Sequence, residues 1–248
     1  MIEVSAVFKK LSGTEVLRGV SLSLERGRFL ALIGPSGSGK SVLLKHLAGL
    51  IRPDRGHVLI DGVDVGATRG RDLEQLRRRF GFLFQNGALF DSLTSYDNIA
   101  FPLREKTDLE EDEIREKVSF VLEEVGLAGT EDKYPSELSG GMVKRTALAR
   151  ALVMDPEIIF FDEPTTGLDP IIAKSMLDLF DACHHRLNLT GVIVSHNVPD
   201  IFRIVNRVAM LHDGKAICAE VRDGAIQSDD PVLRQFTEGT QEGPVTYK

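Results

Sequence analysis

The sequence predicts an α/β fold, and two observations support this. The run Phe29–Ile33 is continuously apolar and leads into a glycine-rich segment, as expected for a strand buried on both faces of a parallel sheet. Similar runs at 81–84, 158–161 and 191–194 alternate with stretches of helical spacing. Together they indicate a doubly wound sheet that presents its functional groups at the carboxyl ends of its strands.

The start of the chain and its middle predict two additions to this sheet. Residues 2–24 alternate short apolar runs with Ser, Gly and Lys, which favours an antiparallel β element. The strand signal is lost between about 86 and 154, where a helical insert is expected. Its clearest helix is predicted to begin at Asp108 and stop at Gly126, with the buried stripe Ile114, Val118, Val121 and Val125.

The later helix and the tail complete the predicted organisation. Asp169-Pro170 should start a helix whose apolar stripe includes Cys183, so this thiol is expected in the core. Residues 2–224 are read as one domain carrying the insert. Residues 225–248 are polar with isolated apolar side chains, and we expect a partner-docking arm.

Composition excludes several classes of protein. The chain has 248 residues, of which 42% are hydrophobic, enough for a substantial core. A net charge of −7 and a pI near 5.4 argue against broad binding to nucleic acid. The two cysteines suggest neither a disulfide framework nor a zinc site, and a reducing, cytosolic setting is expected. No apolar stretch reaches the roughly 20 residues that span a bilayer and no signal peptide is evident, so the chain itself is expected to be soluble.

A phosphate-binding loop directly follows the first buried strand. The segment fits G-x-x-x-x-G-K-[ST] between a strand and a helix, the context in which that motif has physical meaning. Its glycine amides can converge on phosphate oxygens, its lysine supplies charge, and its last hydroxyl can reach Mg²⁺. The predicted ATP site is Gly34, Pro35, Ser36, Gly37, Ser38, Gly39, Lys40 and Ser41.

Two carboxylates follow the strand at 158–161. We expect Asp162 to hold Mg²⁺ and Glu163 to polarise the water that attacks the γ-phosphate of ATP. Taken alone, such a pair is more often a helix cap or a loop. The P-loop elsewhere in the chain favours the catalytic interpretation.

A second anion site is predicted where Ser139, Gly140 and Gly141 precede a helical run. The alternative is a purely structural role, in which Ser139 only caps a helix. Because the P-loop already holds one nucleotide, a second site makes most sense if it closes on ATP bound by another copy. The expected assembly is a two-fold dimer with two shared sites.

Six motifs follow one another along the chain: the P-loop, Gln85 after a strand, Leu138-Ser139-Gly140-Gly141, Phe160-Phe161-Asp162-Glu163, Gly167-Leu168-Asp169 and His196. In this order they resemble the motifs of the ABC ATPase family over nearly the full length. The resemblance implies a P-loop NTPase fold of the ABC nucleotide-binding type with ATP and Mg²⁺. It implies that Gln85 senses γ-phosphate and Mg²⁺, Asp169 crosses a head-to-tail dimer interface and His196 holds the γ-phosphate. Their alternatives are a strand-end polar residue, a helix N-cap and a core histidine.

Two positions depart from the family pattern. Met142 stands where the signature usually has Gln, and Phe8 or Leu11 falls where an aromatic often stacks on adenine. If stacking is weak, phosphate contacts supply most of the affinity. Only modest discrimination between ATP and GTP is then expected.

A narrower resemblance, to the ATPase subunits of MCE-type phospholipid transporters, lies in residues 84–94, 98–105, 138–142 and 230–236. It implies an MlaE-type permease, an MCE-domain substrate-binding protein and, in some members, an MlaB-type STAS protein as partners. The implied location is peripheral, on the cytoplasmic face of the bacterial inner membrane. The segment 85–90 would pass motion to the permease. The C-terminal tail, anchored by Phe236, would embrace the second ATPase subunit.

Other functions remain open at this stage. An importer ATPase for amino acids or ions shares the same motor motifs, because these do not encode cargo. A soluble ABC ATPase acting on DNA or ribosomes usually shows coiled-coil inserts, zinc cysteines or duplicated domains, which the sequence lacks. The arginine cluster at 69–79 is interleaved with acidic residues, which favours a solvent-exposed helix face over a site that contacts lipid headgroups.

Overall fold

The computed structural model describes residues 1–196 and 198–245, which form an α/β fold of two units. One unit comprises residues 1–74 together with those from Thr190 onwards, and the other comprises Gln75–Leu189. Within the described ranges, no helix is long and apolar enough to cross a membrane. The predicted insert at about 86–154 lies inside the second unit, which also contains two strands and a later helix.

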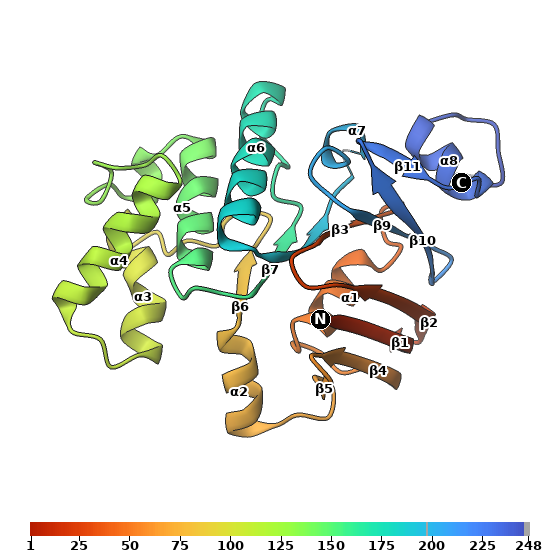
Figure 1. The fold of residues 1–248 in the computed structure, drawn as a ribbon, viewed down its shortest axis with the longest axis horizontal. Helices are drawn as coiled ribbons and strands as arrows, with labels where there is room; N and C mark the ends of the chain where they lie inside the picture. Colours follow the sequence, from red (N-terminus) through yellow and green to blue (C-terminus); the bar gives the residue numbers. More distant parts are fainter. Residues whose placement is uncertain (197, 246–248) are drawn as a thin grey trace. The chain divides into compact units, whose positions relative to one another are not determined.

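The first unit holds the predicted antiparallel element. Strands β1 (Ile2–Leu11), β2 (Thr14–Leu24), β4 (Arg55–Ile60) and β5 (Val63–Asp64) form a sheet of order β2-β1-β4-β5, in which every neighbouring pair is antiparallel (Figure 1). The antiparallel prediction for residues 2–24 is therefore confirmed.

The parallel strands of the first unit surround the strand predicted from Phe29–Ile33. This strand, β3, pairs in parallel with β8 (Thr190–Val194) and with β9 (Arg207–His212), and all five of its residues are buried. Strands β10 (Lys215–Arg222) and β11 (Ala225–Gln227) extend β9 in antiparallel fashion. Gly191 permits this packing, because a β-carbon there would lie 2.4 Å from the Phe29 ring.

Four hairpin turns connect neighbouring strands of this unit, and all four have the same backbone conformation. Each places a non-glycine residue and a following glycine at positive φ, which matches the twist of antiparallel strands and favours Asp-Gly and similar pairs. The four turns are Ser12-Gly13, Asp61-Gly62, Asp213-Gly214 and Asp223-Gly224.

Helices α1 (Lys40–Leu47), α7 (Val198–Ile201) and α8 (Pro231–Glu238) also belong to the first unit, and α2 (Gly70–Arg78) runs across the boundary at Glu74. The predicted docking arm therefore contains a short strand and a helix. Asp230 caps α8 by accepting from the amides of Val232 and Leu233, and Leu233 is buried. Phe236, the expected anchor, is half-buried in its own unit.

The second unit combines a strand pair with the predicted helices. Strands β6 (Phe80–Leu83) and β7 (Ile158–Asp162) are parallel. Helices α3 (Ser95–Lys106), α4 (Glu111–Glu124) and α5 (Gly140–Leu152) pack on one another (Figure 1), with a 3₁₀ turn, η1, at Pro135–Glu137, and α6 (Pro170–Leu187) follows β7.

Two sequence predictions in this unit can be compared directly with the structure. The helix expected from Asp108 begins instead at Glu111, because the Glu110 amide is already capped by the Glu113 carboxylate at 2.9 Å. Its stripe Ile114, Val118, Val121 and Val125 is buried as predicted. Cys183 lies in the core of α6, and burial raises its pKa to about 11.

Candidate functional site

The phosphate-binding loop joins β3 to α1 as the sequence predicts. Gly34, Gly37 and Gly39 take φ values of 137°, 78° and 102°, which side chains rarely tolerate. A β-carbon on Gly34 would lie 2.4 Å from the Leu211 carbonyl oxygen, so the backbone needs glycine here. The loop ends at Gly39, directly before α1, and Gly39 provides no side-chain cap for that helix.

Lys40 and Ser38 give this loop its polar interior. Lys40 is 7% exposed, and its ammonium group donates to the carbonyl oxygens of Gly34 at 2.8 Å and Pro35 at 2.9 Å. The Ser38 hydroxyl is buried and has no hydrogen-bond partner within the described chain. A buried cation beside an unsatisfied hydroxyl at a helix N-terminus is an arrangement that a phosphate would satisfy.

A cavity of about 370 Å³ opens beside this loop, within the first unit. Its walls are Thr14, Glu15, Val16 and Arg18 of β2, the P-loop residues 35–38, residues 212–214 at the β9–β10 turn, and Val245. Phe8, one candidate for stacking on adenine, does not line the cavity. It packs on Gly19, and the Arg55 guanidinium lies 4.1 Å from its ring centroid. Leu11, the other candidate, is 40% exposed and is also absent from the walls.

His196 follows β8, the parallel neighbour of β3. Leu32 pairs with Val194, and the Ser195 amide donates to the Leu32 carbonyl oxygen at 3.3 Å. The segment carrying His196 therefore leaves the sheet at the same edge as the P-loop, and its side chain is exposed. The alternative of a buried core histidine is not what the structure shows.

The acidic pair sits at the carboxyl end of β7 in the second unit. Both Asp162 and Glu163 are half-buried. Glu163 has φ 50°, an uncommon backbone state for a residue with a side chain, and such states concentrate at functional sites. The Thr166 hydroxyl donates to the Glu163 carboxylate at 2.9 Å, which orients one oxygen and leaves the group at the strand end.

Ser139 and Asp169 both cap helices, as their structural alternatives predicted. The Ser139 hydroxyl accepts from the Met142 amide at 3.3 Å, and one Asp169 oxygen accepts from the amides of Ile171 and Ile172 at 3.1 and 3.0 Å. Both capping residues are exposed. Helix capping thus explains why Ser and Asp occupy these positions, and both residues remain accessible to a ligand or a second chain.

Gly141 brings these two helix starts together. A β-carbon on Gly141 would lie 2.8 Å from the Ile172 side chain, so α5 meets the first turn of α6 at close range. Gly140 precedes this contact at the exposed first position of α5. Beside them Ile171 is 81% exposed, which leaves a large apolar side chain next to Asp169.

The loop after β6 carries Gln85, which shares its strand edge with Asp162 because β6 and β7 run parallel. Basic side chains of α5 hold this loop, a feature that local sequence reasoning missed. Lys144 donates to the Gln85 carbonyl oxygen, and Arg150 donates to those of Gly87 and Ala88 at 2.7 and 2.8 Å. Burial lowers the pKa of both cations.

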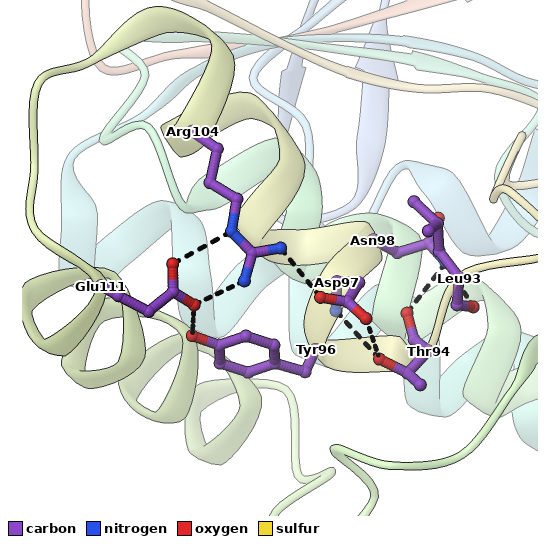
Figure 2. A network of polar contacts seen from close by, with 7 residues as sticks. All are labelled: Leu93, Thr94, Tyr96, Asp97, Asn98, Arg104 and Glu111. Carbon is purple, nitrogen blue, oxygen red and sulfur yellow. Dashed lines mark hydrogen bonds and ion pairs between the residues drawn. The ribbon is translucent and has the colours of Figure 1, made fainter.

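Asn98 fixes the turn that follows. Its side-chain amide donates to the carbonyl oxygens of Phe90, Leu93 and Thr94 at 3.0–3.1 Å, and its oxygen accepts from the Phe90 amide at 2.8 Å. Figure 2 shows this turn beside a second network in which Arg104 lies between Asp97 and Glu111. Sequence reasoning also missed Asn98, although an asparagine four residues after a turn threonine was its visible signal.

An exposed aromatic surface results. Phe84, Phe90 and Phe101 are 41%, 46% and 40% exposed, and the rings of Phe90 and Phe101 lie 5.0 Å apart. Phe84 stacks on Phe82 at 4.2 Å. Large apolar side chains gathered around an exposed loop are typical of a protein contact surface.

The chain is similar to known ATP-binding proteins along its whole length. Residues 17–166 match the family model described as ABC transporter. The Haemophilus influenzae "Intermembrane phospholipid transport system ATP-binding protein MlaF" is 42% identical over 248 residues, covering 100% of this chain and 94% of that protein. The Mycobacterium leprae "Probable ribonucleotide transport ATP-binding protein mkl" is 45% identical over 244 residues, covering 98% and 70%.

The fold is similar to that of solved ATP-binding cassettes. The dimeric post-hydrolysis state of the cassette MJ0796 bound to ADP and Pi superposes with a TM-score of 0.81 at 31% identity. The match covers 90% of this chain and 99% of that one.

Proposed function

Because the chain belongs to the ABC transporter family and is an ATP-hydrolysing member of it, we propose that it powers a transporter that moves phospholipid between bacterial membranes. The assignment of phospholipid as the cargo rests on the end-to-end similarity to the H. influenzae MlaF protein at 42% identity. Residues 84–94 and 230–236, which carry the narrower resemblance, support the same choice.

A second cargo has a specific observation in its favour. The M. leprae relative, 45% identical, is named for probable ribonucleotide transport. Because the cargo of an ABC transporter passes through the membrane subunits, the motor residues carry no information about it. The two cargoes must therefore be separated by transport measurements.

In the proposed mechanism, the P-loop binds the triphosphate of ATP. Lys40 supplies the positive charge, and the buried Ser38 hydroxyl and the glycine-rich backbone supply donors that are already in place. Ser41, Gln85 and Asp162 offer hydroxyl, amide and carboxylate oxygens, a donor set that suits Mg²⁺. Mg²⁺ held there would neutralise charge on the phosphates.

Glu163 is proposed to act on the attacking water. Its carboxylate stands at the end of β7 with one oxygen held by Thr166. The carboxylate is then oriented to accept a hydrogen bond from a water molecule. His196, exposed at the edge of the sheet that carries the P-loop, is proposed to contact the γ-phosphate.

The second anion site is proposed to complete the active site of another copy. Ser139, Gly140, Gly141 and Asp169 lie at two adjoining helix starts, where all but the half-buried Gly141 are exposed, and Ile171 adds an apolar contact beside them. A head-to-tail dimer with ATP between the copies would use all of these groups. The dimeric cassette to which this fold is similar supports this proposal.

The partners are proposed from the surfaces and the resemblance. The exposed aromatic surface at Phe84, Phe90 and Phe101 suits the cytoplasmic part of an MlaE-type permease, itself joined to an MCE-domain protein. The tail helix α8 is proposed to contact the second copy or an MlaB-type STAS protein. The chain would then work at the cytoplasmic face of the inner membrane.

The test is transport by the reassembled complex in lipid vesicles. The chain is purified with the permease and the MCE-domain protein of the same organism, and transfer of a fluorescent phospholipid is measured with Mg-ATP. Glu163→Gln should lower hydrolysis at least about 100-fold and trap an ATP-bound dimer. Glu157→Gln is the matched control, because Glu157 lies at the amino end of β7, where it forms a half-buried ion pair with Arg79, and hydrolysis should change little.

The cargo and the role of Glu163 would be contradicted by different results. Movement of a labelled ribonucleotide in place of phospholipid would replace the cargo and leave the motor intact. If wild type bound ATP without hydrolysing it, even with the permease, the role of Glu163 would be wrong.

A further inference from the structure

The cavity beside the P-loop receives a contribution from the far end of the chain. Val245 lines it together with Val16 of β2 and the P-loop residues Ser36, Gly37 and Ser38. Its volume of about 370 Å³ lies within the range of about 300–1,000 Å³ usual for small-molecule sites. All of these residues belong to the first unit.

Val245 is held in this wall by a specific side chain. The Gln235 amide group of α8 donates to the Val245 carbonyl oxygen at 3.0 Å, and its oxygen accepts from the Val245 amide at 2.7 Å. Gln235 is 4% exposed and Val245 is 4% exposed. A buried glutamine that satisfies both backbone groups of one residue mimics a strand partner and fixes that residue's position.

The segment between these two residues is closely fitted. Gly243 has φ 154°, and a β-carbon there would lie 2.4 Å from the Gln235 side chain. Helix α8 itself is anchored by the Asp230 cap and by Leu233, which is buried. The position of Val245 is therefore set by a chain of packed contacts that starts in the body of the unit.

The wall has a chemistry that suits a nucleoside. Val16, Pro35 and Val245 are apolar side chains of this wall, and among the described residues that line it none is Phe, Tyr or Trp. The aromatic candidate Phe8 is engaged by Gly19 and Arg55 instead. A base and ribose attached to phosphates in the P-loop would extend from that loop, and the cavity adjoins it directly.

We propose that Val245, positioned by Gln235, forms part of the site that receives the nucleoside of the bound nucleotide, so that the C-terminal tail contributes to nucleotide affinity. This inference rests on the proposed binding of phosphates by the P-loop. It adds Val245 as a contact residue and Gln235 as a positioning residue. Neither was among the site residues expected from sequence.

The test compares two ligands that differ by the nucleoside. Dissociation constants for ADP and for inorganic pyrophosphate are measured by calorimetry on the full-length chain, since neither ligand is turned over by a phosphohydrolase acting on a γ-phosphate. Val245→Ala and Gln235→Ala should weaken ADP binding about three- to tenfold and leave pyrophosphate binding unchanged. Val232→Ala, in the first turn of the same helix, is the matched control and should change neither.

Other outcomes would overturn the inference in distinguishable ways. Equal weakening of ADP and pyrophosphate would mean that the tail only supports the fold of the P-loop. Tighter ADP binding in Val245→Ala would mean that Val245 obstructs the site. Unchanged ADP binding in Val245→Ala would exclude the contact, even if Gln235→Ala disturbed the tail. If wild type bound neither ligand, the P-loop assignment itself would fail.

Discussion

Lys144 of α5 donates a hydrogen bond from its ammonium group to the backbone carbonyl oxygen of Gln85. Ser139 and Gly140 begin the helix that carries Lys144, and Gln85 begins the loop that leads to the exposed aromatic surface. A buried cation thus links the second anion site to the proposed permease contact. Arg150, about 1.7 turns further along the helix, strengthens the link by donating to Gly87 and Ala88.

Replacing Lys144 should weaken the coupling between these two surfaces. Lys144→Met keeps most of the apolar stem and removes the donor, so the Gln85 carbonyl loses a charge-assisted hydrogen bond. Stimulation of ATP hydrolysis by the permease should fall about 2- to 30-fold, which corresponds to about 0.5–2 kcal/mol of coupling. The ratio of stimulated to unstimulated turnover measures this.

Lys144→Arg is the matched control, because it retains a cationic donor. It should keep most of the stimulation. A Lys144→Met protein whose stimulation ratio equals that of wild type would show that the link carries no coupling.

Asn98 should matter more for stability than its neighbours in the same helix. Asn98→Leu has a similar size but leaves the Phe90 amide and three carbonyl oxygens of the turn without this partner. The free energy of unfolding should fall by about 3 kcal/mol. Urea denaturation followed by circular dichroism measures the change.

Tyr96→Phe serves as the comparison for Asn98. It removes one exposed hydrogen bond from the phenol to Glu111, in the network around Arg104 that Figure 2 draws. Its cost should be below about 1 kcal/mol. Equal losses for the two variants would contradict the special role of the Asn98 turn.

Adenine and guanine nucleotides should bind with similar affinity. The described walls of the cavity hold apolar valines and no Phe, Tyr or Trp to stack on one base in preference to another. Competition of ATP and GTP for a fluorescent ATP analogue should give dissociation constants within about tenfold of each other. A preference for ATP well beyond that would mean that hydrogen-bonding groups read the base.

His46 should make the chain less stable in mild acid. It is 1% exposed, its Nδ1 lies 2.7 Å from the Val42 carbonyl oxygen, and its Nε2 is buried without a hydrogen-bond partner in the described structure. Burial lowers the pKa of His46 below its ordinary value, and the Val42 hydrogen bond opposes this only in part. The folded state therefore favours the neutral ring.

The sign of the effect follows from that lowered pKa. Above about pH 6.5 both folded and unfolded states hold a neutral ring, and the stabilisation is complete. As the pH falls below this value the unfolded state takes up the proton more readily, so the free energy of unfolding drops by at most about 1.4 kcal/mol per pH unit. His46→Asn, which keeps a donor near the Val42 carbonyl, should show a shallower dependence between pH 7 and pH 5. An unchanged slope would assign the effect to other groups.

The sequence by itself determined the features that depend on neighbouring residues. Strand β3 and its glycine loop, the caps at Ser139 and Asp169, the start of α6 at Pro170 and the buried stripe of α4 follow from local rules of turn, cap and periodicity. Local rules also placed Gln85, Asp162, Glu163 and His196 at strand ends. These are the places where a doubly wound sheet presents its chemistry.

Tertiary structure decided the contacts between residues far apart in the chain. Lys144 donates to Gln85, which lies 59 positions earlier in the sequence. Phe8 packs on Gly19 and beside the Arg55 guanidinium, so it does not line the cavity. Val245 reaches the wall beside Ser38 because Gln235 holds it there. Such contacts depend on how buried polar groups find partners once the core has formed, and a one-dimensional pattern does not encode which partner is near.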